Sequence, residues 1–107
     1  MDPVVCLVTT PPGDARAIAT ALVERELAAC VNIVAAVASV YRWQGAVEQD
    51  EESLLVIKNT RDAVDALDDA LSELHPYDTF ELVALEVRGG SRDYLDWIAQ
   101  SVALPGP

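Results

Sequence analysis

The stretch that decides the fold is Val37–Lys58, which reads VASVYRWQGAVEQDEESLLVIK. It predicts two β-strands joined through a turn at Gln44-Gly45-Ala46. Residues 54–57 are all apolar, and because successive side chains of a strand point to opposite faces, both faces of the second strand are apolar there. Both faces must therefore be covered, and in so short a chain we expect another copy of the protein to supply the second cover.

The acidic balance of the chain limits its partners. The 107 residues carry 18 acidic and 7 basic side chains, a net charge of −11. Such a surface repels phosphate backbones and anionic membranes, which argues against nucleic acid and membranes as partners and favours cations. No apolar run approaches the roughly 20 residues that cross a bilayer, and no basic segment precedes the first apolar run. We expect a single domain over residues 1–107, located in the cytoplasm.

The rest of the chain predicts an alternation of strands and helices. Strands are expected at residues 4–8, 30–43, 47–59 and 81–87, with a bend at Ala35-Ala36 in the second of them. Helices are expected at 14–29 and at about 60–74, and a short third helix is expected after Ser91. Residues 104–107 are expected to form a tail that is either frayed or docked on the domain. Pro76 ends the second helix, because proline disfavours helical geometry in the residue before it. The order indicates an α+β, ferredoxin-like βαββαβ antiparallel sheet with a short C-terminal helix.

One face of such a sheet is covered by the two long helices, and the other face is left bare. Burying a Leu- or Val-sized side chain contributes roughly 1.5–3 kcal/mol, and several exposed ones would form a larger apolar patch than soluble monomers usually carry. We therefore predict that the sheets of several subunits pack face to face in a closed ring. The long hairpin would also let strand edges pair between subunits.

Few side chains indicate chemistry. His75, the only histidine, is either a metal ligand or proton carrier, or a helix C-terminal residue stabilised by the helix dipole, which its position favours. Lys58 ends an apolar strand, where a lysine reaching toward the rim is the simpler account. Tyr41 and Trp43 share one strand face, either as an aromatic shelf or, as we favour, as anchors of a subunit contact.

Other patterns argue against an enzyme. The acidic residues between positions 48 and 52 could attract cations, although such clusters are usually solvated strand ends. Cys6 and Cys30 form no C-x-x-C pair, and Cys6 lies in an apolar run where packing is expected. One histidine cannot form a His-His metal pair, and the chain has no glycine-rich phosphate loop or recognisable Ser/His/Asp set.

Four blocks of sequence taken together resemble one family. They are LAACVNI at residues 27–33, SVYRWQG at 39–45, LHPY at 74–77 and YLDWI at 94–98. Over roughly residues 4 to 100 the chain resembles the CutA family of divalent-cation tolerance proteins. The resemblance implies a cytoplasmic, non-catalytic homotrimer of ferredoxin-like subunits, linked to tolerance of copper and other divalent metals.

The resemblance also implies a set of functional residues near the subunit contacts. His75 and Cys30 are the metal candidates, because imidazole and thiolate suit copper. No cofactor is required, and copper or another divalent metal ion is the candidate ligand. The remaining residues form an expected intersubunit pocket: Asn32, Tyr41, Trp43, Gln44, Lys58, Tyr77 and Glu81.

The chain departs from the family pattern in three places. Ala35-Ala36 stand where relatives often have Pro-Gly, so a softer bend is expected. Thr79-Phe80-Glu81 stand where Thr-Pro-Glu is usual, which removes a rigid turn before Glu81. Val8 stands where some relatives have a cysteine, which weakens copper binding at that location.

Two alternative functions follow from the same pattern. The first is a PII-like trimeric signalling module that binds a small ligand or anion at subunit clefts, with Lys58 and Arg42 as possible contacts. The net charge and the missing phosphate loop argue against it. The second is a structural or interaction protein whose trimer is itself the function.

Overall fold

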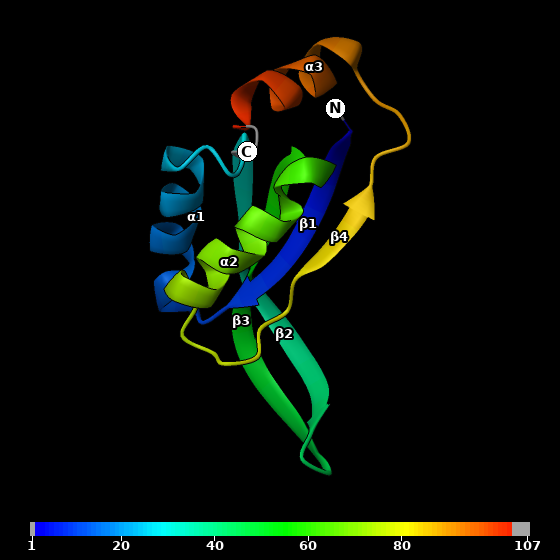
Figure 1. The fold of residues 1–107 in the computed structure, drawn as a ribbon. Coiled ribbons are helices and arrows are strands. Elements are labelled where there is room, and N and C mark those ends of the chain that lie inside the picture. Colours follow the sequence, from blue (N-terminus) through cyan, green and yellow to red (C-terminus); the bar gives the residue numbers. More distant parts are fainter. Residues whose placement is uncertain (1, 104–107) are drawn as a thin grey trace.

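The computed structural model describes residues 2–103 (Figure 1). Its elements are β1 (Pro3–Thr10), the 3-10 turn η1 (Pro12–Asp14), α1 (Ala15–Glu24), β2 (Cys30–Trp43), β3 (Ala46–Thr60), the 3-10 turn η2 (Arg61–Ala63), α2 (Val64–Leu74), β4 (Val83–Glu86) and α3 (Arg92–Ser101). The predicted βαββαβ order with a C-terminal helix is confirmed. The tail predicted at 104–107 lies outside the described residues. Between residues 2 and 103, no helix is long and apolar enough to cross a membrane.

The strands form one antiparallel sheet in the order β2-β3-β1-β4. Helices α1 and α2 cover one face of it (Figure 1). Alternate side chains of β1 and β3 point into this layer, as the period of a strand requires. The fully buried members of the core are Cys6, Val8, Leu22, Leu55, Ile57, Leu67 and Leu71.

The opposite face of the sheet, which we call the open face, is also apolar. Residues paired across strands share a face, so Leu7 of β1 stands beside Val56 of β3 and Val83 of β4. The apolar members of the open face are Val5, Leu7, Val34, Leu54, Val56, Val83 and Leu85. Three of them, Val34, Val83 and Leu85, are 43%, 47% and 46% exposed. The prediction that both faces of the 54–57 run are apolar is confirmed.

Strands β2 and β3 run on beyond the other two strands as a two-stranded arm. β1 pairs with β3 only from Ser53 to Thr60, so residues 37–52 have no third strand beside them. The arm extends below the body of the molecule in Figure 1. It turns through Gln44 and Gly45, whose positive φ angles of 49° and 84° match the turn type that suits strand twist. Because a lone hairpin is only marginally stable in water, this arm is expected to gain from a covering partner.

The predicted bend in β2 is a β-bulge. The pairing register with β3 slips between Val34 and Val37, which leaves Ala35 and Ala36 outside the ladder. The Ser53 hydroxyl donates to the Ala35 carbonyl oxygen at 2.8 Å and holds the bulge. A bulge increases the local twist, so it sets the direction of the arm.

Helix α1 ends at Glu24 and does not reach the predicted Ala29. The Leu27 N–H donates to the Leu22 carbonyl and the Glu26 N–H to the Val23 carbonyl, both at 3.0 Å. With a φ of 58° at Glu26, these bonds form a Schellman helix end. Glycine is the usual residue at this position, so the sequence contained no recognisable stop signal.

Strand β4 is shorter than the predicted 81–87. It pairs only with the Val4–Leu7 segment of β1. Before it, Phe80 turns back and stacks on His75, with ring centroids 5.0 Å apart. The predicted strand residues Glu81, Leu82 and Val87 lie outside β4.

Candidate functional site

Three of the predicted residues meet on the open face at its upper end, the end near α3 in Figure 1. Cys30 and Lys58 are direct partners in the β2–β3 register, and Asn32 lies two residues further on the same face. The Lys58 Nζ donates to Asn32 Oδ1. The Cys30 thiol donates to the same oxygen at 3.8 Å. One amide oxygen thus joins an ammonium group and a thiol.

Tyr94 of α3 completes this upper cluster, and the sequence analysis missed it. Burial raises the pKa of Tyr94, and the adjacent Cys30 thiol raises it further. The Tyr94 ring also lies against Trp97, at a centroid distance of 5.5 Å. No sequence signal could have located this contact, because it depends on how α3 docks on the sheet.

His75 lies at the lower end of the sheet and is only 6% exposed. The Tyr77 N–H donates to its Nδ1 at 3.1 Å. The other nitrogen, Nε2, therefore carries the proton and donates to the Thr9 carbonyl oxygen at 2.8 Å. Because both ring nitrogens bind backbone groups, His75 fastens the loop after α2 to the end of β1.

The arm carries a cross-strand pair between Tyr41, a predicted pocket residue, and Asp50, which lay outside the predicted site. The Tyr41 hydroxyl donates to the Asp50 carboxylate. That bond, with burial and nearby acidic charges as further causes, raises the pKa of Tyr41 to about 12. Asp50 is two residues from Glu48, the direct partner of Tyr41, and such diagonal neighbours are within reach of an aromatic side chain. The register of a two-residue hairpin could have indicated this pair.

The other predicted pocket residues are spread over the arm and the lower loop. Trp43 is 51% exposed on the arm, and Gln44 forms part of its turn. Tyr77 is 40% exposed, and burial, followed by the charges of nearby acids, raises its pKa. Glu81 lies exposed in the loop before β4.

A single subunit therefore does not assemble one pocket from the predicted residues. Cys30 is level with Val5 along the sheet, through their shared partner Lys58, whereas His75 contacts Thr9. Four residues of strand span roughly 13 Å, so the two metal candidates are not neighbours. The intersubunit pocket stays a prediction.

The donor set of one subunit does not fit a resident metal ion. Within residues 2–103, no three His, Cys, Asp or Glu side chains are grouped closely enough to hold one. His75 has no free ring nitrogen. Cys30 shares its acceptor with the Lys58 ammonium, whose positive charge disfavours a second cation.

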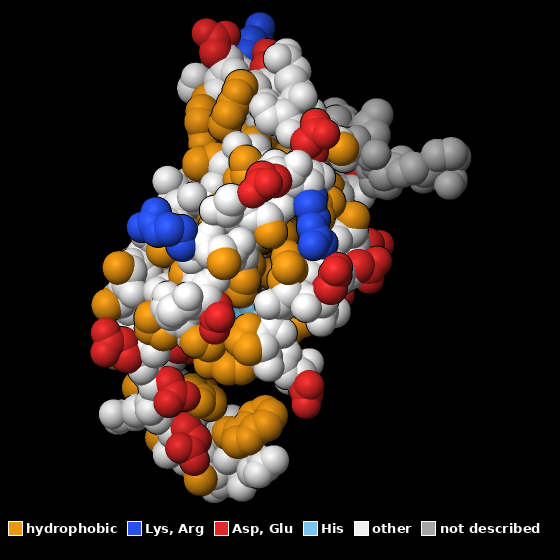
Figure 2. Space-filling view, turned by 90° about the vertical axis from the view of Figure 1, so that its left-hand side faces the viewer, with side chains coloured by type: hydrophobic (Ala, Val, Ile, Leu, Met, Phe, Trp, Pro, Cys, Tyr) orange, Lys and Arg blue, Asp and Glu red, His pale blue; other side chains and the backbone are white. Residues whose placement is uncertain are grey.

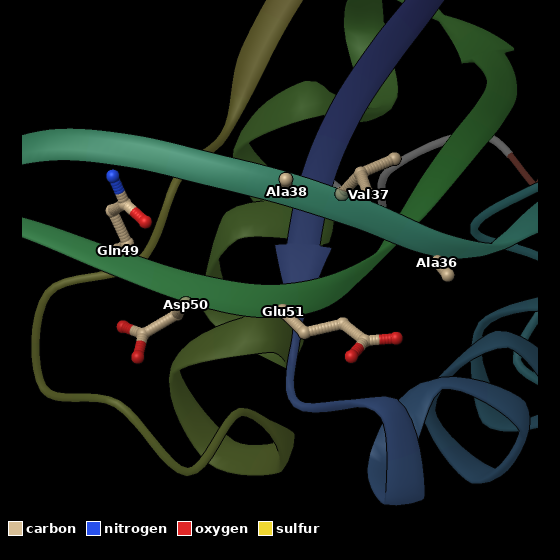
Figure 3. A pocket seen from close by; sticks show the side chains of 6 residues that line it. All are labelled: Ala36, Val37, Ala38, Gln49, Asp50 and Glu51. Atoms are coloured by element: carbon tan, nitrogen blue, oxygen red, sulfur yellow. The ribbon is translucent and has the colours of Figure 1, made fainter.

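The arm also carries an open pocket of about 430 Å³, lined by Ala36, Val37, Ala38, Gln49, Asp50 and Glu51 (Figure 3). The carboxylates of Asp50 and Glu51 point away from each other in this view. They do not converge as metal ligands must. Figure 2 shows apolar and acidic side chains side by side at the lower end of the molecule, where the arm lies.

Comparison with known proteins shows the family to which the chain is related. A family model described as CutA1 divalent ion tolerance protein matches residues 4–101. This chain belongs to the CutA1 family. A CutA1 relative from Thermus thermophilus, a divalent-cation tolerance protein CutA, is 50% identical over 98 residues, which cover 91% of this chain and 95% of the relative. A solved structure of CutA1 from the same organism has a TM-score of 0.92 at 48% identity, covering 94% of this chain and 99% of that chain.

Two further CutA1 relatives add detail. The solved structure of a PII-like protein CutA from Nostoc sp. has a TM-score of 0.89 at 34% identity, covering 95% of this chain and 99% of that chain. A chloroplastic protein CutA from Arabidopsis thaliana is 41% identical over 99 residues. These residues cover 92% of this chain and 54% of the relative, so the chain spans about half of that relative's length. The CutA resemblance inferred from four sequence blocks is confirmed.

Proposed function

We propose that this CutA1 family member acts in divalent-cation tolerance as a non-catalytic homotrimer in the cytoplasm. The observation that carries the proposal is the open face, an apolar sheet surface whose Val83 and Leu85 remain nearly half exposed in one subunit. Packing three such faces together would remove them from water. The compartment is part of the proposal, since one relative is named chloroplastic.

The proposed interaction with cations is weak and electrostatic. With a net charge of −11, each subunit raises the local concentration of divalent ions through its field, without a cage of ligands. Copper and other divalent ions would associate with the acidic surface, and no cofactor is required. A site that uses Cys30 and His75 together would need residues of different subunits.

The absence of catalysis is supported by the state of the reactive side chains. The single imidazole is engaged by backbone groups on both nitrogens. Burial raises the pKa of the Cys6 thiol to about 11, so it is not a nucleophile at neutral pH. Neither group is positioned to attack a substrate or to transfer a proton to one.

Calorimetric titration with Cu(II) and Zn(II) tests the cation role. We expect weak binding that falls steeply as salt is raised, because exposed charges are screened over about 8 Å at physiological ionic strength. His75→Ala should leave this binding unchanged. No heat at low salt would contradict cation binding, and tight stoichiometric binding lost in His75→Ala would show a built site instead.

A second candidate function is favoured by the likeness to the PII-like protein CutA of Nostoc sp.. In that role the trimer would bind a small ligand or anion at subunit clefts. A thermal-shift screen with ATP, ADP and cyclic nucleotides separates the two functions. A rise of several degrees with one nucleotide would favour the PII-like role.

A further inference from the structure

A second pocket, which we call the α2 pocket, lies on the helix side of the sheet. It is formed between α2 and the loop that joins α2 to β4, which runs beneath that helix in Figure 1. Its volume is about 350 Å³, and six residues line it: Asp68, Ser72, Asp78, Thr79, Phe80 and Leu82. Helix α2 covers the face of the sheet opposite to the open face. Subunits packed through their open faces would therefore leave this pocket accessible.

The inner wall of the α2 pocket is apolar. Phe80 and Leu82 are half-buried and pack against the hydrophobic core. The ring of Phe80 is held in place by its stack on His75, at a centroid distance of 5.0 Å. Phe80 stands where proline is usual in the family, so this aromatic wall is a feature of the present chain and not of the family pattern.

The rim of the α2 pocket carries negative charge and hydrogen-bond acceptors. Asp68 and Asp78 are exposed, and no ion pair between residues 2 and 103 includes either of them. The Ser72 hydroxyl donates to the Asp68 carbonyl at 3.1 Å, so the lone pairs of its oxygen are left to accept. Ionised carboxylates also only accept. The rim is therefore complementary to a positively charged hydrogen-bond donor.

The outer surface of α2 extends this charge beyond the pocket. Asp65 and Asp69 are exposed as well and lie within one turn of Asp68, and like charges at this spacing destabilise a helix. A segment with more than one basic residue would neutralise this surface, whereas a single small cation would not. The arrangement favours a basic stretch of protein as the partner.

One side chain combines the two properties that the α2 pocket requires. Arginine has an apolar stem of methylene groups below its charged head. The planar guanidinium presents five N–H donors, which suit two carboxylates and a hydroxyl better than the compact ammonium of lysine does. We propose that the α2 pocket receives an arginine side chain from a basic segment of a partner protein, with its stem against Phe80 and Leu82 and its head bound by Asp68 and Asp78. This partner is additional to the proposed role in cation tolerance.

Titration of the full chain with short peptides tests the proposal. The capped peptide Gly-Arg-Gly-Arg-Gly is compared with a version in which citrulline, which has nearly the shape of arginine without its charge, replaces each arginine. Backbone N–H resonances of Ser72 and Thr79 are followed by nuclear magnetic resonance at low salt. We expect saturable shifts with the arginine peptide and none with the citrulline peptide.

Matched variants separate the pocket from the general acidity of the molecule. Asp78→Asn should weaken binding of the arginine peptide about fivefold, the effect of one unit charge at 4 Å in water. Asp69→Asn removes the same charge from a residue of α2 that does not line the pocket, and it should weaken binding by less than about twofold because the charge is more distant and screened. Phe80→Ala should weaken it about fourfold, the equivalent of one buried methylene group. Because Asp78 is exposed, its variant keeps the test decisive if Phe80→Ala does not fold.

Three results would overturn the proposal. They are equal shifts with the citrulline peptide, shifts that do not saturate, and equal weakening by Asp69→Asn and Asp78→Asn, which would show that only the overall charge attracts the peptide. A lysine version of the peptide checks the assigned side chain. Weaker binding of that version would support arginine, and equal or tighter binding would contradict it.

Discussion

At the scale of single residues, His75 shows a side chain suited to chemistry that is used for structure. Its two nitrogens satisfy the Thr9 carbonyl and the Tyr77 N–H, and its ring stacks on Phe80. The extended backbone of His75, which precedes Pro76, ends α2 at this position. The imidazole thus fastens the loop that follows α2 to the end of β1, which is 66 residues away in sequence.

Replacing His75 by alanine should therefore lower stability. Two backbone groups would lose their partner, and an unsatisfied buried group typically costs about 1–3 kcal/mol. Urea unfolding at a fixed protein concentration measures the change. Ser72→Ala is the control, because Ser72 is exposed and bonds only the Asp68 carbonyl of its own helix. Equal midpoints for the two variants would contradict the structural role of His75.

At the scale of elements, the end of α1 stores strain in a residue other than glycine. Glu26 holds a φ of 58°, where a side chain is disfavoured by roughly 1–2 kcal/mol. Its backbone carbonyl also accepts from the Ala103 N–H at 2.9 Å. The helix thus stops at a position that the later chain helps to fix.

Glu26→Gly is expected to raise stability by about 1 kcal/mol, because glycine adopts positive φ without that penalty. Glu24→Gly, two residues earlier at the last position of α1, should lower stability, by at most about 1 kcal/mol, because glycine disfavours the helical backbone. Thermal unfolding of both variants compares the signs directly. Destabilisation by both substitutions would show that Glu26 contributes contacts that outweigh its strain.

The arm gives a pH-dependent prediction. The neutral Tyr41 phenol donates to Asp50, so its ionisation is delayed to a pKa of about 12, and this bond is present below pH 10 and lost as pH rises through 12. In a background where Tyr77 and Tyr94 are phenylalanine, Asp50→Asn should move the ultraviolet titration of Tyr41 toward the ordinary value of about 10. Glu48→Gln should have a smaller effect. An unmoved midpoint would contradict the hydrogen bond as the cause.

At the scale of the whole molecule, we expect assembly because helices cover only one of the two faces of the sheet. The helices bury the side chains that β1 and β3 direct toward them, such as Cys6, Leu55 and Ile57, while the open face and the arm keep large apolar side chains in water. Val40 and Val47 of the arm are 62% and 66% exposed. The open face and the arm would therefore both gain from a partner. In a closed symmetric assembly, identical copies can cover both surfaces.

A matched pair of variants tests this assembly. Leu85 on the open face and Val23 on α1 are 46% and 42% exposed in one subunit, so either position accepts an aspartate without disturbing the core. Leu85→Asp should yield particles of the subunit mass, 11.5 kDa, whereas Val23→Asp should sediment like the wild type. Identical sedimentation of the two variants would rule out the open face as the contact.

Local sequence patterns predicted the strands and their order. The element boundaries that those patterns missed are set by contacts between residues that the patterns do not include. The continuous apolar run at residues 54–57 predicted β3 and its two apolar faces. The end of α1 was missed because Glu26 stands where glycine usually signals a stop. β4 is shorter than predicted because it pairs only with the Val4–Leu7 segment of β1.

The candidate site was predictable only as a set of residue names. Strand register brings Cys30, Asn32 and Lys58 together, and the family resemblance had already selected all three. The docking of Tyr94 depends on α3, and the bond made by Nε2 of His75 depends on the Thr9 carbonyl, which is 66 residues away in sequence. Neither contact can be predicted from the spacing of residues along the sequence.

Having one lysine has a practical consequence for anyone who handles this protein. Amine coupling, the common way to fix a protein to a biosensor chip, would find a single side chain to react with, that of Lys58 on the open face. Molecules tethered there would be held by the surface through which they are expected to associate. Reductive methylation with isotope-labelled formaldehyde would instead place a small magnetic-resonance probe at that ε-amine and report whether the surface is covered.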